Sequence, residues 1–478
     1  MVLSYQCSMP MTRSSISHVA TLRSCNKKTS LFFSTPLFLS CGKMPSIIGL
    51  SSLSLLTLPS KAAHVSKSHP LMMIEPQEKD EDGRSLCRFY DYINGKVLIT
   101  NTKIPEEVDR AICVGSSHGW LAYVSRLDCS IFLWSPFTTS PLILLPPIHT
   151  LPFVTVIPHE ELDGDVDEDD VDINSFSNNS KKSAYDDNFS SDFGFKVERR
   201  DQHGCKSYYT ISPKHLSLQI IRKIVFSYAP TSDDCIVVAL IEHANHKSIA
   251  FCKPGDKSWT FVEPPPKRSL WLEDVIHFKN QLFYTVSHNC GGTTLCAYDL
   301  ADLSSPKSYI FETSFDFEPL SALDECTRTW YTQKYYLVES LGYLLWVRRH
   351  IANNMNGDGE FIYSFIYDIF PDQTVMFDVY RLDFSRNTWK CMKCIGDQVV
   401  FLGINQSLSL SAQHFISLKG NHIYYTDDSR GRHWKYCSFG GQDFGHYEVG
   451  GSKFTINFKS CRDLKILPPP IWVMRNFH

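Results

Sequence analysis

Short apolar runs divided by turn residues constrain the fold of this chain more than any other feature of its sequence. Beyond about residue 85, stretches rich in Val, Ile, Tyr, Phe and Trp alternate with Gly, Asn, Asp and Pro, and no long segment repeats apolar residues at helical spacing. One run, LWLEDVIHF (270–278), is expected to form at most a turn that leads into a strand. The clearest strand candidates are CIVVALIEH (235–243), KSIAFCKP (247–254), QLFYTVSH (281–288), KYYLVES (334–340), YLLWVRR (343–349) and HIYYTDD (422–428).

The strand candidates recur as a unit in which an apolar strand, a Gly or Asn turn and a second strand follow one another. These turns lie at Gly119, Asn280, Gly342 and Gly420. A later strand ends in a polar turn six residues before a Trp, as between Lys253 and Trp259 or Asp383 and Trp389. Four-stranded propeller blades need roughly 40–50 residues each, and their radial packing hides strand edges without helices. The sequence therefore predicts an all-β protein, a β-propeller of roughly six to eight small antiparallel blades.

The first 70 residues differ in composition from the rest of the chain. They contain no Asp or Glu, are rich in Ser and Thr, and carry seven basic residues, Arg13, Arg23, Lys27, Lys28, Lys43, Lys61 and Lys67. The remaining residues hold 40 basic and 51 acidic side chains, a net charge of −11. An acid-free, Ser-rich and sparsely basic N-terminus is typical of a transit peptide. We interpret residues 1–70 as a disordered import leader that starts at Met1 or Met44 and directs the chain to mitochondria, with chloroplasts as the second choice.

The apolar and cysteine-containing segments suggest neither a membrane anchor nor a secreted protein. The stretches at 31–40 and 47–58 are too short and too rich in Ser to span a bilayer core of about 30 Å, so we expect no membrane insertion. The 16 cysteines are scattered singly, in apolar contexts such as AICVG (111–115) and IAFCKP (249–254). This distribution indicates buried free thiols in a reducing compartment and not a disulfide framework.

Residues 158–192 are expected to interrupt the propeller as a disordered acidic insertion. The segment EELDGDVDEDDVD (160–172) has nine acids in thirteen residues and cannot bury enough apolar surface to order itself. Asp163, Asp165 and Asp167 alternate as calcium-loop ligands do, but the Gly and the Glu that such a loop needs at its sixth and twelfth positions are missing. We therefore predict no metal site in this segment.

The sequence Gly115-Ser116-Ser117-His118-Gly119 fits the G-x-S-x-G pattern of serine hydrolases, in which the serine occupies a strand-to-helix turn. The residues that follow, GWLAYVSRLDCSIFLW, predict a β-hairpin instead of a helix, and no HGGG-type oxyanion segment occurs in the sequence. We also expect that His118, the next residue, cannot fold back as the base of Ser117 in triad geometry. We therefore predict no catalytic residue and interpret both glycines as tight-turn residues. A hydrolase that uses Ser117 is kept as the third functional alternative.

Other candidate sites also favour structural roles. Cys391 and Cys394 resemble half of a zinc site or a redox pair, but no second pair lies nearby in the sequence. Two carboxyl pairs occur, Glu273-Asp274 and Asp324-Glu325, and we interpret them as solvated turn residues and not as a general acid and base. Two basic pairs occur, Arg348-Arg349 and Lys267-Arg268. Nucleic-acid binding needs clustered positive charge, and two isolated basic pairs in a chain of net negative charge disfavour it. The sequence thus predicts no cofactor, no metal and no small-molecule substrate.

A set of motifs occurs in a fixed order along the chain. It comprises GSSHGWLAY (115–123), LLPPI (144–148), AFCKPGDKSWT (250–260), EDVIHFKNQLFY (273–284), YLVESLGYLLWVRR (336–349), VYRLDFSRNTWKCM (379–392), GDQVVFLGINQSLSLSA (396–412), IYYTDD (423–428) and PPPIWV (468–473). In these motifs the chain resembles the plant-specific KIB-type β-propeller family, formerly a domain of unknown function, two-nine-five. The resemblance implies a propeller over residues 85–475, preceded by a linker at 71–84.

The resemblance also implies what the chain does. Many relatives carry an N-terminal F-box, a helical module that docks onto a ubiquitin-ligase adaptor while the propeller binds the substrate. Between Pro70 and Val114 no leucine-rich helical run is present and the leader-like segment precedes this stretch, so the chain is similar to an organelle-targeted branch that lacks the F-box. This implies a non-catalytic organellar scaffold that binds an unknown protein partner. The alternative is an F-box-like ubiquitin-ligase substrate receptor in the cytosol or nucleus.

Overall fold

The chain divides into two compact units, Met1–Ala63 and His64–His478, and every residue that the structure describes lies in the second. The computed structural model describes residues 69–74, 81–109, 111–162, 192–200, 205–243, 246–262, 270–279, 281–289, 292–316, 331–352, 373–415, 417–428, 443–451, 454–455 and 470–475. The predicted leader up to residue 68 and the acidic segment at 163–191 lie outside these ranges, as do Asp324-Glu325 and Lys267-Arg268.

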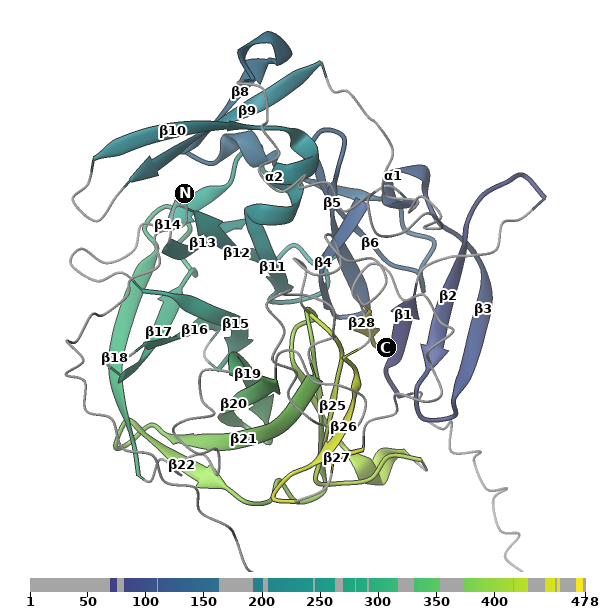
Figure 1. Cartoon of the computed structure of the whole chain (residues 1–478), viewed down its shortest axis with the longest axis vertical. Helices are drawn as coiled ribbons and strands as arrows, with labels where there is room; N and C mark the ends of the chain where they lie inside the picture. The colour runs from purple at the N-terminus through teal and green to yellow at the C-terminus, as the bar shows by residue number, and fades with distance from the viewer. Residues whose placement is uncertain are drawn as a thin grey trace, which may run out of the picture. The chain divides into compact units, whose positions relative to one another are not determined.

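Within these ranges the second unit contains six blade-like sheets around one axis, of which the third and fourth are joined at their outer edges (Figure 1). From the axis outward, the first sheet has β4 (Ala111–Ser117), β5 (Trp120–Ser125), β6 (Ile131–Trp134) and β7 (Ile143–Leu145). The second has β11 (Ile221–Phe226), β12 (Val237–His243), β13 (His246–Cys252) and β14 (Thr260–Val262). The third has β15 (Leu272–Phe278), β16 (Leu282–Asn289), β17 (Gly292–Asp299) and β18 (Lys307–Phe315).

The fourth sheet has β19 (Tyr331–Ser340), β20 (Tyr343–Ala352), β21 (Gln373–Asp383) and β22 (Thr388–Met392), and β22 pairs in parallel with β18 of the third. The fifth has β24 (Leu408–Ser411), β23 (Gln398–Leu402), β25 (His422–Tyr425), β26 (Gly445–Glu448) and β27 (Phe454–Thr455). The sixth, the closing sheet, has β28 (Ile471–Val473), β1 (Leu71–Ile74), β2 (Leu86–Asp91) and β3 (Lys96–Lys103). A smaller sheet of β8 (Val154–Pro158), β9 (Phe193–Arg200) and β10 (Lys206–Ile211) and the short helices α1 (Glu106–Asp109) and α2 (Pro213–Gln219) complete the elements discussed here.

Each neighbouring pair of these six sheets buries one apolar cluster between its members. The clusters follow from the two-residue period of a strand, which sends successive side chains to opposite faces. In β23, for example, Val399 and Phe401 pack with Trp472 of the closing sheet, whereas Val400 and Leu402 pack against the fourth sheet. A sheet that is apolar on both faces needs a neighbour on each side, and a closed ring supplies both. The all-β propeller prediction is therefore confirmed, with six blades in the described part.

The two ends of the propeller meet in the closing sheet. β1 pairs antiparallel with both β2 and β28, so that Met72 lies opposite Tyr90 on one side and Trp472 on the other. The linker predicted over 71–84 therefore contains a strand of the propeller, and this prediction was wrong for Leu71–Ile74. The motif PPPIWV had no obvious strand partner in the sequence, because its partner β1 lies about 400 residues away along the chain.

Two of the recurring turns connect the innermost strand of a blade to the next strand. His118 and Gly119, with φ of 51° and 75°, link β4 to β5, and Leu341 and Gly342, with the same two φ values, link β19 to β20. Two consecutive residues with positive φ make the turn whose twist matches a β-hairpin. The predicted strand–turn–strand unit is therefore confirmed at Gly119 and Gly342. At Gly420 the unit differs, because β24 and the 3-10 turn Ala412–His414 precede β25, and β23 pairs in parallel with β25.

Two other predictions need correction. The run at 270–278 was expected to be at most a turn before a strand, yet Leu272–Phe278 forms β15, the innermost strand of its blade. The acidic insertion was expected to begin at residue 158, but Pro158 ends β8, where it lies opposite Phe193 of β9, and His159–Glu161 form a 3-10 turn. The insertion thus begins after an ordered turn and connects the two strands of a hairpin.

Candidate functional site

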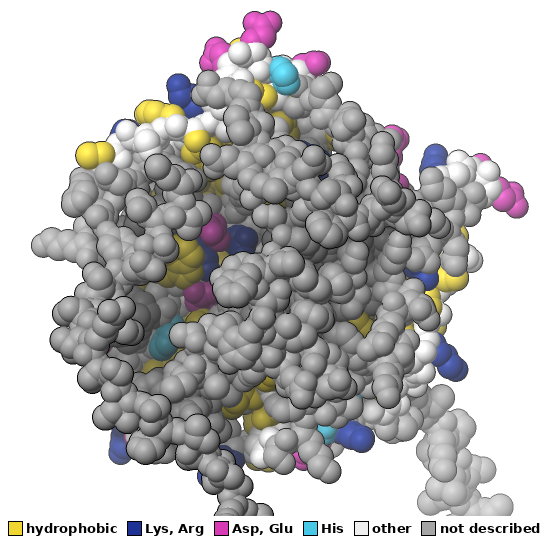
Figure 2. All heavy atoms as spheres, in the orientation of Figure 1, with side chains coloured by type: hydrophobic (Ala, Val, Ile, Leu, Met, Phe, Trp, Pro, Cys, Tyr) yellow, Lys and Arg dark blue, Asp and Glu magenta, His cyan; other side chains and the backbone are white. Residues whose placement is uncertain are grey.

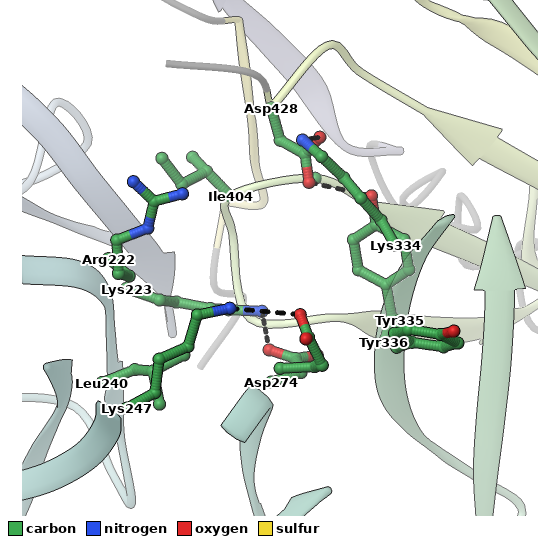
Figure 3. Close-up of a pocket in the computed structure, with 12 residues that line it drawn as sticks. Arg222, Lys223, Leu240, Lys247, Asp274, Lys334, Tyr335, Tyr336, Ile404 and Asp428 are labelled. Atoms are coloured by element: carbon green, nitrogen blue, oxygen red, sulfur yellow. Dashed lines mark hydrogen bonds and ion pairs between the residues drawn. The ribbon is translucent and has the colours of Figure 1, made fainter. Parts of the chain in front are cut away.

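A small cavity of about 110 Å³ lies among the inner strands of the propeller (Figure 3). Side chains near the start of β11, β15 and β19 line it, together with residues that follow β23 and β25. Figure 2 shows basic and acidic side chains side by side within a hollow near the middle of one face. The lining residues are Arg222, Lys223, Leu240, Lys247, Glu273, Asp274, Lys334, Tyr335, Tyr336, Gly403, Ile404 and Asp428.

Asp274 is the most deeply buried carboxylate of this cavity. Its side chain lies 2.5 Å from Nζ of Lys223, and the two groups point toward one another in Figure 3. The backbone amides of Val275 and Leu337 donate to the same carboxylate at 2.9 Å each. Burial raises the pKa of Asp274, although Lys223 and the two amides act in the opposite direction. This carboxylate joins β11, β15 and β19, so the prediction of a solvated turn residue was wrong.

Lys247 and Glu273 form a second ion pair, in which Nζ lies 3.2 Å from the carboxylate. Burial lowers the pKa of Lys247 and raises that of Glu273, because removal from water disfavours both charged forms. The ammonium of Lys247 also lies 4.7 Å from the ring centre of Trp271, whose side chain is 36% exposed. An accessible aromatic ring thus lies beside one cation of the cavity lining. The solvated-turn prediction therefore fails for Glu273 as well.

Asp428 centres a third group of charges. It pairs with Lys334 and accepts a hydrogen bond of 2.8 Å from the hydroxyl of Tyr336. Burial alone would raise the pKa of Asp428, but Lys334 and Arg349 lower it. Arg349, which is 1% exposed, also donates to Asp443 at 2.8 Å. Both members of the Arg348-Arg349 pair are thus buried and ion-paired.

Fixed donors hold two of the three carboxylates of the cavity. Both oxygens of Asp274 accept hydrogen bonds from Lys223 and backbone amides, and Asp428 accepts from Lys334 and Tyr336. The third, Glu273, accepts from Lys247. This arrangement holds charges at fixed positions, which suits recognition of a charged group.

Ser117 occupies the end of β4 and is followed by a turn and by β5, so the predicted hairpin is confirmed and the serine does not lie on a strand-to-helix elbow. The expectation about His118 was wrong in one respect, because Nδ1 lies 2.6 Å from Oγ of Ser117. The same hydroxyl donates to Oε1 of Gln406 at 2.8 Å, so Ser117 joins the turn after β4 to the segment that follows β23.

The two glycines of this motif have different roles. Gly119 has a φ of 75°, as a tight turn requires, and this prediction is confirmed. Gly115 does not lie in the turn. A Cβ at this position would lie 2.1 Å from the backbone oxygen of Ile224, so glycine here allows β4 to approach β11 closely.

The remaining sequence candidates do not form a site in the described part of the chain. Cys391 lies half-buried in β22 and Cys394 is exposed in the turn after it. Cys113 and Cys252, named in the predicted apolar contexts, are buried thiols. Among the described residues no group of three or more His, Cys, Asp or Glu side chains is placed to bind a metal ion. No helix in these ranges has the length and hydropathy of a membrane span.

Most cavity residues were missed from the sequence. Lys223, Lys334 and Asp428 are charged residues within or beside apolar strands, and nothing in the sequence places them together. One usable signal is a charged residue early in an otherwise apolar inner strand, as in IRKIVF (221–226) and LEDVIHF (272–278). A charge in a strand that is buried on both faces needs a partner.

The chain is similar to several known proteins. The F-box protein SKIP23 of Arabidopsis thaliana is 24% identical over 297 residues, which cover 58% of this chain and 64% of that protein. The chain thus matches less than two thirds of the length of this relative. Solved structures with a similar arrangement include a protein from Lactobacillus plantarum (8% identity, 68% of this chain, 94% of that chain, TM-score 0.25). Another is a putative 6-phosphogluconolactonase from Bacteroides fragilis (10% identity, 70% of this chain, 96% of that chain, TM-score 0.25).

A family model described as KIB1-4 beta-propeller matches residues 89–448, three quarters of the chain and most of its six blades. This range begins within β2 and ends with β26, so it contains all five sheets that precede the closing sheet except for the short β27. The matched residues also contain the whole lining of the axial cavity. The chain therefore belongs to the KIB1-4 β-propeller family.

Proposed function

We propose that this chain is a non-catalytic scaffold that binds a protein partner inside mitochondria, with chloroplasts as the second choice of organelle. The observation that carries the scaffold role is the closed ring of six sheets, with charged side chains held at fixed positions on its axis. A rigid ring presents loops and an axial cavity to a partner without needing to move. The composition of residues 1–70 supports the organelle.

Co-purification from organelles tests the scaffold role. The full chain with a C-terminal tag is expressed in plant cells, and mitochondria are isolated before solubilisation and capture. We expect the same protein partner in independent preparations. The control is a chain whose seven basic residues in 1–70 are replaced by Ser, which we expect to stay outside the organelle and to lose that partner. Recovery of the chain alone from mitochondria contradicts the scaffold proposal.

The second candidate function is an F-box-like ubiquitin-ligase substrate receptor, and the similarity to an F-box protein favours it. Against it, the described residues between 69 and 109 form β1, β2 and β3 of the closing sheet and the four-residue α1, not a helical module. A fluorescent fusion of residues 1–70 separates the two proposals. Signal in mitochondria or chloroplasts supports the organellar scaffold, and diffuse cytosolic or nuclear signal supports the receptor.

A further inference from the structure

Two carboxylates of the cavity described above, here called the axial cavity, already accept several hydrogen bonds from the protein. Asp274 accepts three hydrogen bonds, one from Lys223 and two from backbone amides. Asp428 accepts from Lys334, Tyr336 and Arg349. The acceptor capacity of these two carboxylates is thus largely filled by the protein itself.

The three lysines of the cavity, in contrast to these two carboxylates, make few hydrogen bonds. Among the described residues, Lys223, Lys247 and Lys334 each have a single carboxylate partner. An ammonium group carries three N–H donors, so each lysine keeps donors beyond its ion pair. All three line the same small cavity (Figure 3). Glu273, the third carboxylate of the lining, accepts from Lys247 alone among the described residues, so one pair of the cavity also keeps an acceptor. The three ammonium groups together still offer more donors than their ion pairs use, and an anionic group would accept from them.

The size of the cavity suits a small polar end group. Its volume of about 110 Å³ lies below the roughly 300 Å³ at which pockets for drug-sized ligands begin. It has room for an end group such as a carboxylate or a phosphoryl group.

The surroundings of the cavity favour an anion that is carried by a protein. The chain beyond residue 70 has a net charge of −11, which repels free anions at long range, whereas a protein partner can bring basic surface of its own. Trp271 adds a half-exposed aromatic ring beside Lys247. Aromatic residues that remain accessible beside a charged pocket are frequent anchors of interfaces.

We propose that the axial cavity receives the acidic end group of a partner side chain, a carboxylate or a phosphoryl group, through Lys223, Lys247 and Lys334. This inference rests on the proposed scaffold function and names the chemistry of the partner. No covalent step is involved, and the cavity acts by binding alone.

Fluorescence anisotropy with short labelled peptides tests this proposal on the full chain. One peptide carries Glu in a Gly/Ser sequence, a second carries phosphoserine at that position, and a third carries Gln as the neutral control. We expect either acidic peptide to bind at least about tenfold more tightly than the Gln peptide, because a charge-assisted hydrogen bond is lost with each neutralised group. Binding is expected to weaken as salt is raised.

Variants of the chain test whether the acidic peptide binds in the axial cavity. Lys334→Gln is expected to weaken the acidic peptide about tenfold. The double variant Lys247→Met with Glu273→Met removes a whole ion pair, leaves no unpaired charge and is expected to weaken binding similarly. Lys390→Gln is the matched control, because Lys390 pairs with Asp383 on an outer turn and not in the cavity. Thermal unfolding of each variant confirms that it folds before its binding is compared.

Three outcomes overturn the proposal. The first is equal binding of the Glu, phosphoserine and Gln peptides, and the second is binding that Lys334→Gln and the double variant leave unchanged. The third is saturation of the cavity by inorganic phosphate without binding of either acidic peptide, which would assign it to a free anion. Loss of the scaffold function is distinguishable, because it leaves the peptide results intact while no partner is captured from organelles.

Discussion

At the scale of single residues, Asp274 connects three inner strands through one carboxylate. It contacts Lys223 on β11 and the amide of Leu337 on β19, and its side chain is almost fully buried. We expect Asp274→Ala to lower the free energy of unfolding by about 3–5 kcal/mol, because it leaves the buried ammonium without its partner. Urea unfolding measures the change. Asp82→Ala, which removes the exposed partner of Lys103, should cost about 1 kcal/mol or less.

His277 is expected to make stability depend on pH. Burial lowers its pKa from 6.5 to about 4, and its Nε2 has no hydrogen-bond partner among the described residues. Between these values the unfolded chain binds a proton that the folded chain excludes, so the contribution of His277 is complete above pH 6.5 and is lost as pH falls toward 4. We expect His277→Phe to reduce the loss of stability between pH 7 and pH 5 by about 1 kcal/mol, discounted for partial exposure. An unchanged pH profile in urea unfolding would contradict this.

Single residues also show where the sequence was informative. The turn role of Gly119 followed from its place between two apolar runs. The role of Gly115 did not, because the atom that excludes a side chain there belongs to Ile224, more than a hundred residues later. The contact of Ser117 with Gln406 was hidden for the same reason. Local conformation could be predicted, whereas contacts between blades could not.

At the scale of elements, β28 closes the ring through Trp472. Its indole packs against Phe401 and Tyr92, and its Nε1 donates to the backbone oxygen of Leu402 at 3.2 Å. We expect Trp472→Ala to lower the free energy of unfolding by about 3–5 kcal/mol, since it opens a cavity between the fifth sheet and the closing sheet. Chemical denaturation measures the loss. The matched variant Trp271→Ala removes an accessible indole and should cost about 1 kcal/mol or less.

β15, which the sequence analysis missed, differs in a physical way from the strands that it predicted. β12, β13, β16 and β20 each contain an apolar run whose side chains are buried on both faces of the sheet. β15 carries Glu273 and Asp274 near its start, and their charges resemble a turn. Those charges are buried against lysines from other strands, which no local pattern reveals. The strand was misread because it belongs to the candidate site.

At the scale of the whole molecule, the propeller and its repeat could be predicted but the axial cavity could not. Periodicity along the chain reports the blades, since short strands and turns recur along it and two blades share the same Gly turn. The cavity depends on how the blades are arranged around the axis, and its residues come from positions as far apart as Arg222 and Asp428. The same arrangement brings β1 and β28 together, which is why the first strand was assigned to a linker.

The closing sheet also limits where an import leader can be removed. β1 begins at Leu71 and supplies β28 with its partner, so cleavage beyond Ile74 would leave β28 unpaired and open the ring. We therefore expect the mature N-terminus in isolated mitochondria to lie before Leu71. N-terminal peptide mass spectrometry of the captured chain measures it. A mature start after Ile74 would contradict the role of β1 in closure, and a chain that keeps residues 1–70 intact inside the organelle would contradict a cleaved leader. The variant Met72→Asp separates these two claims, because it should destabilise the propeller while leaving import and cleavage unchanged.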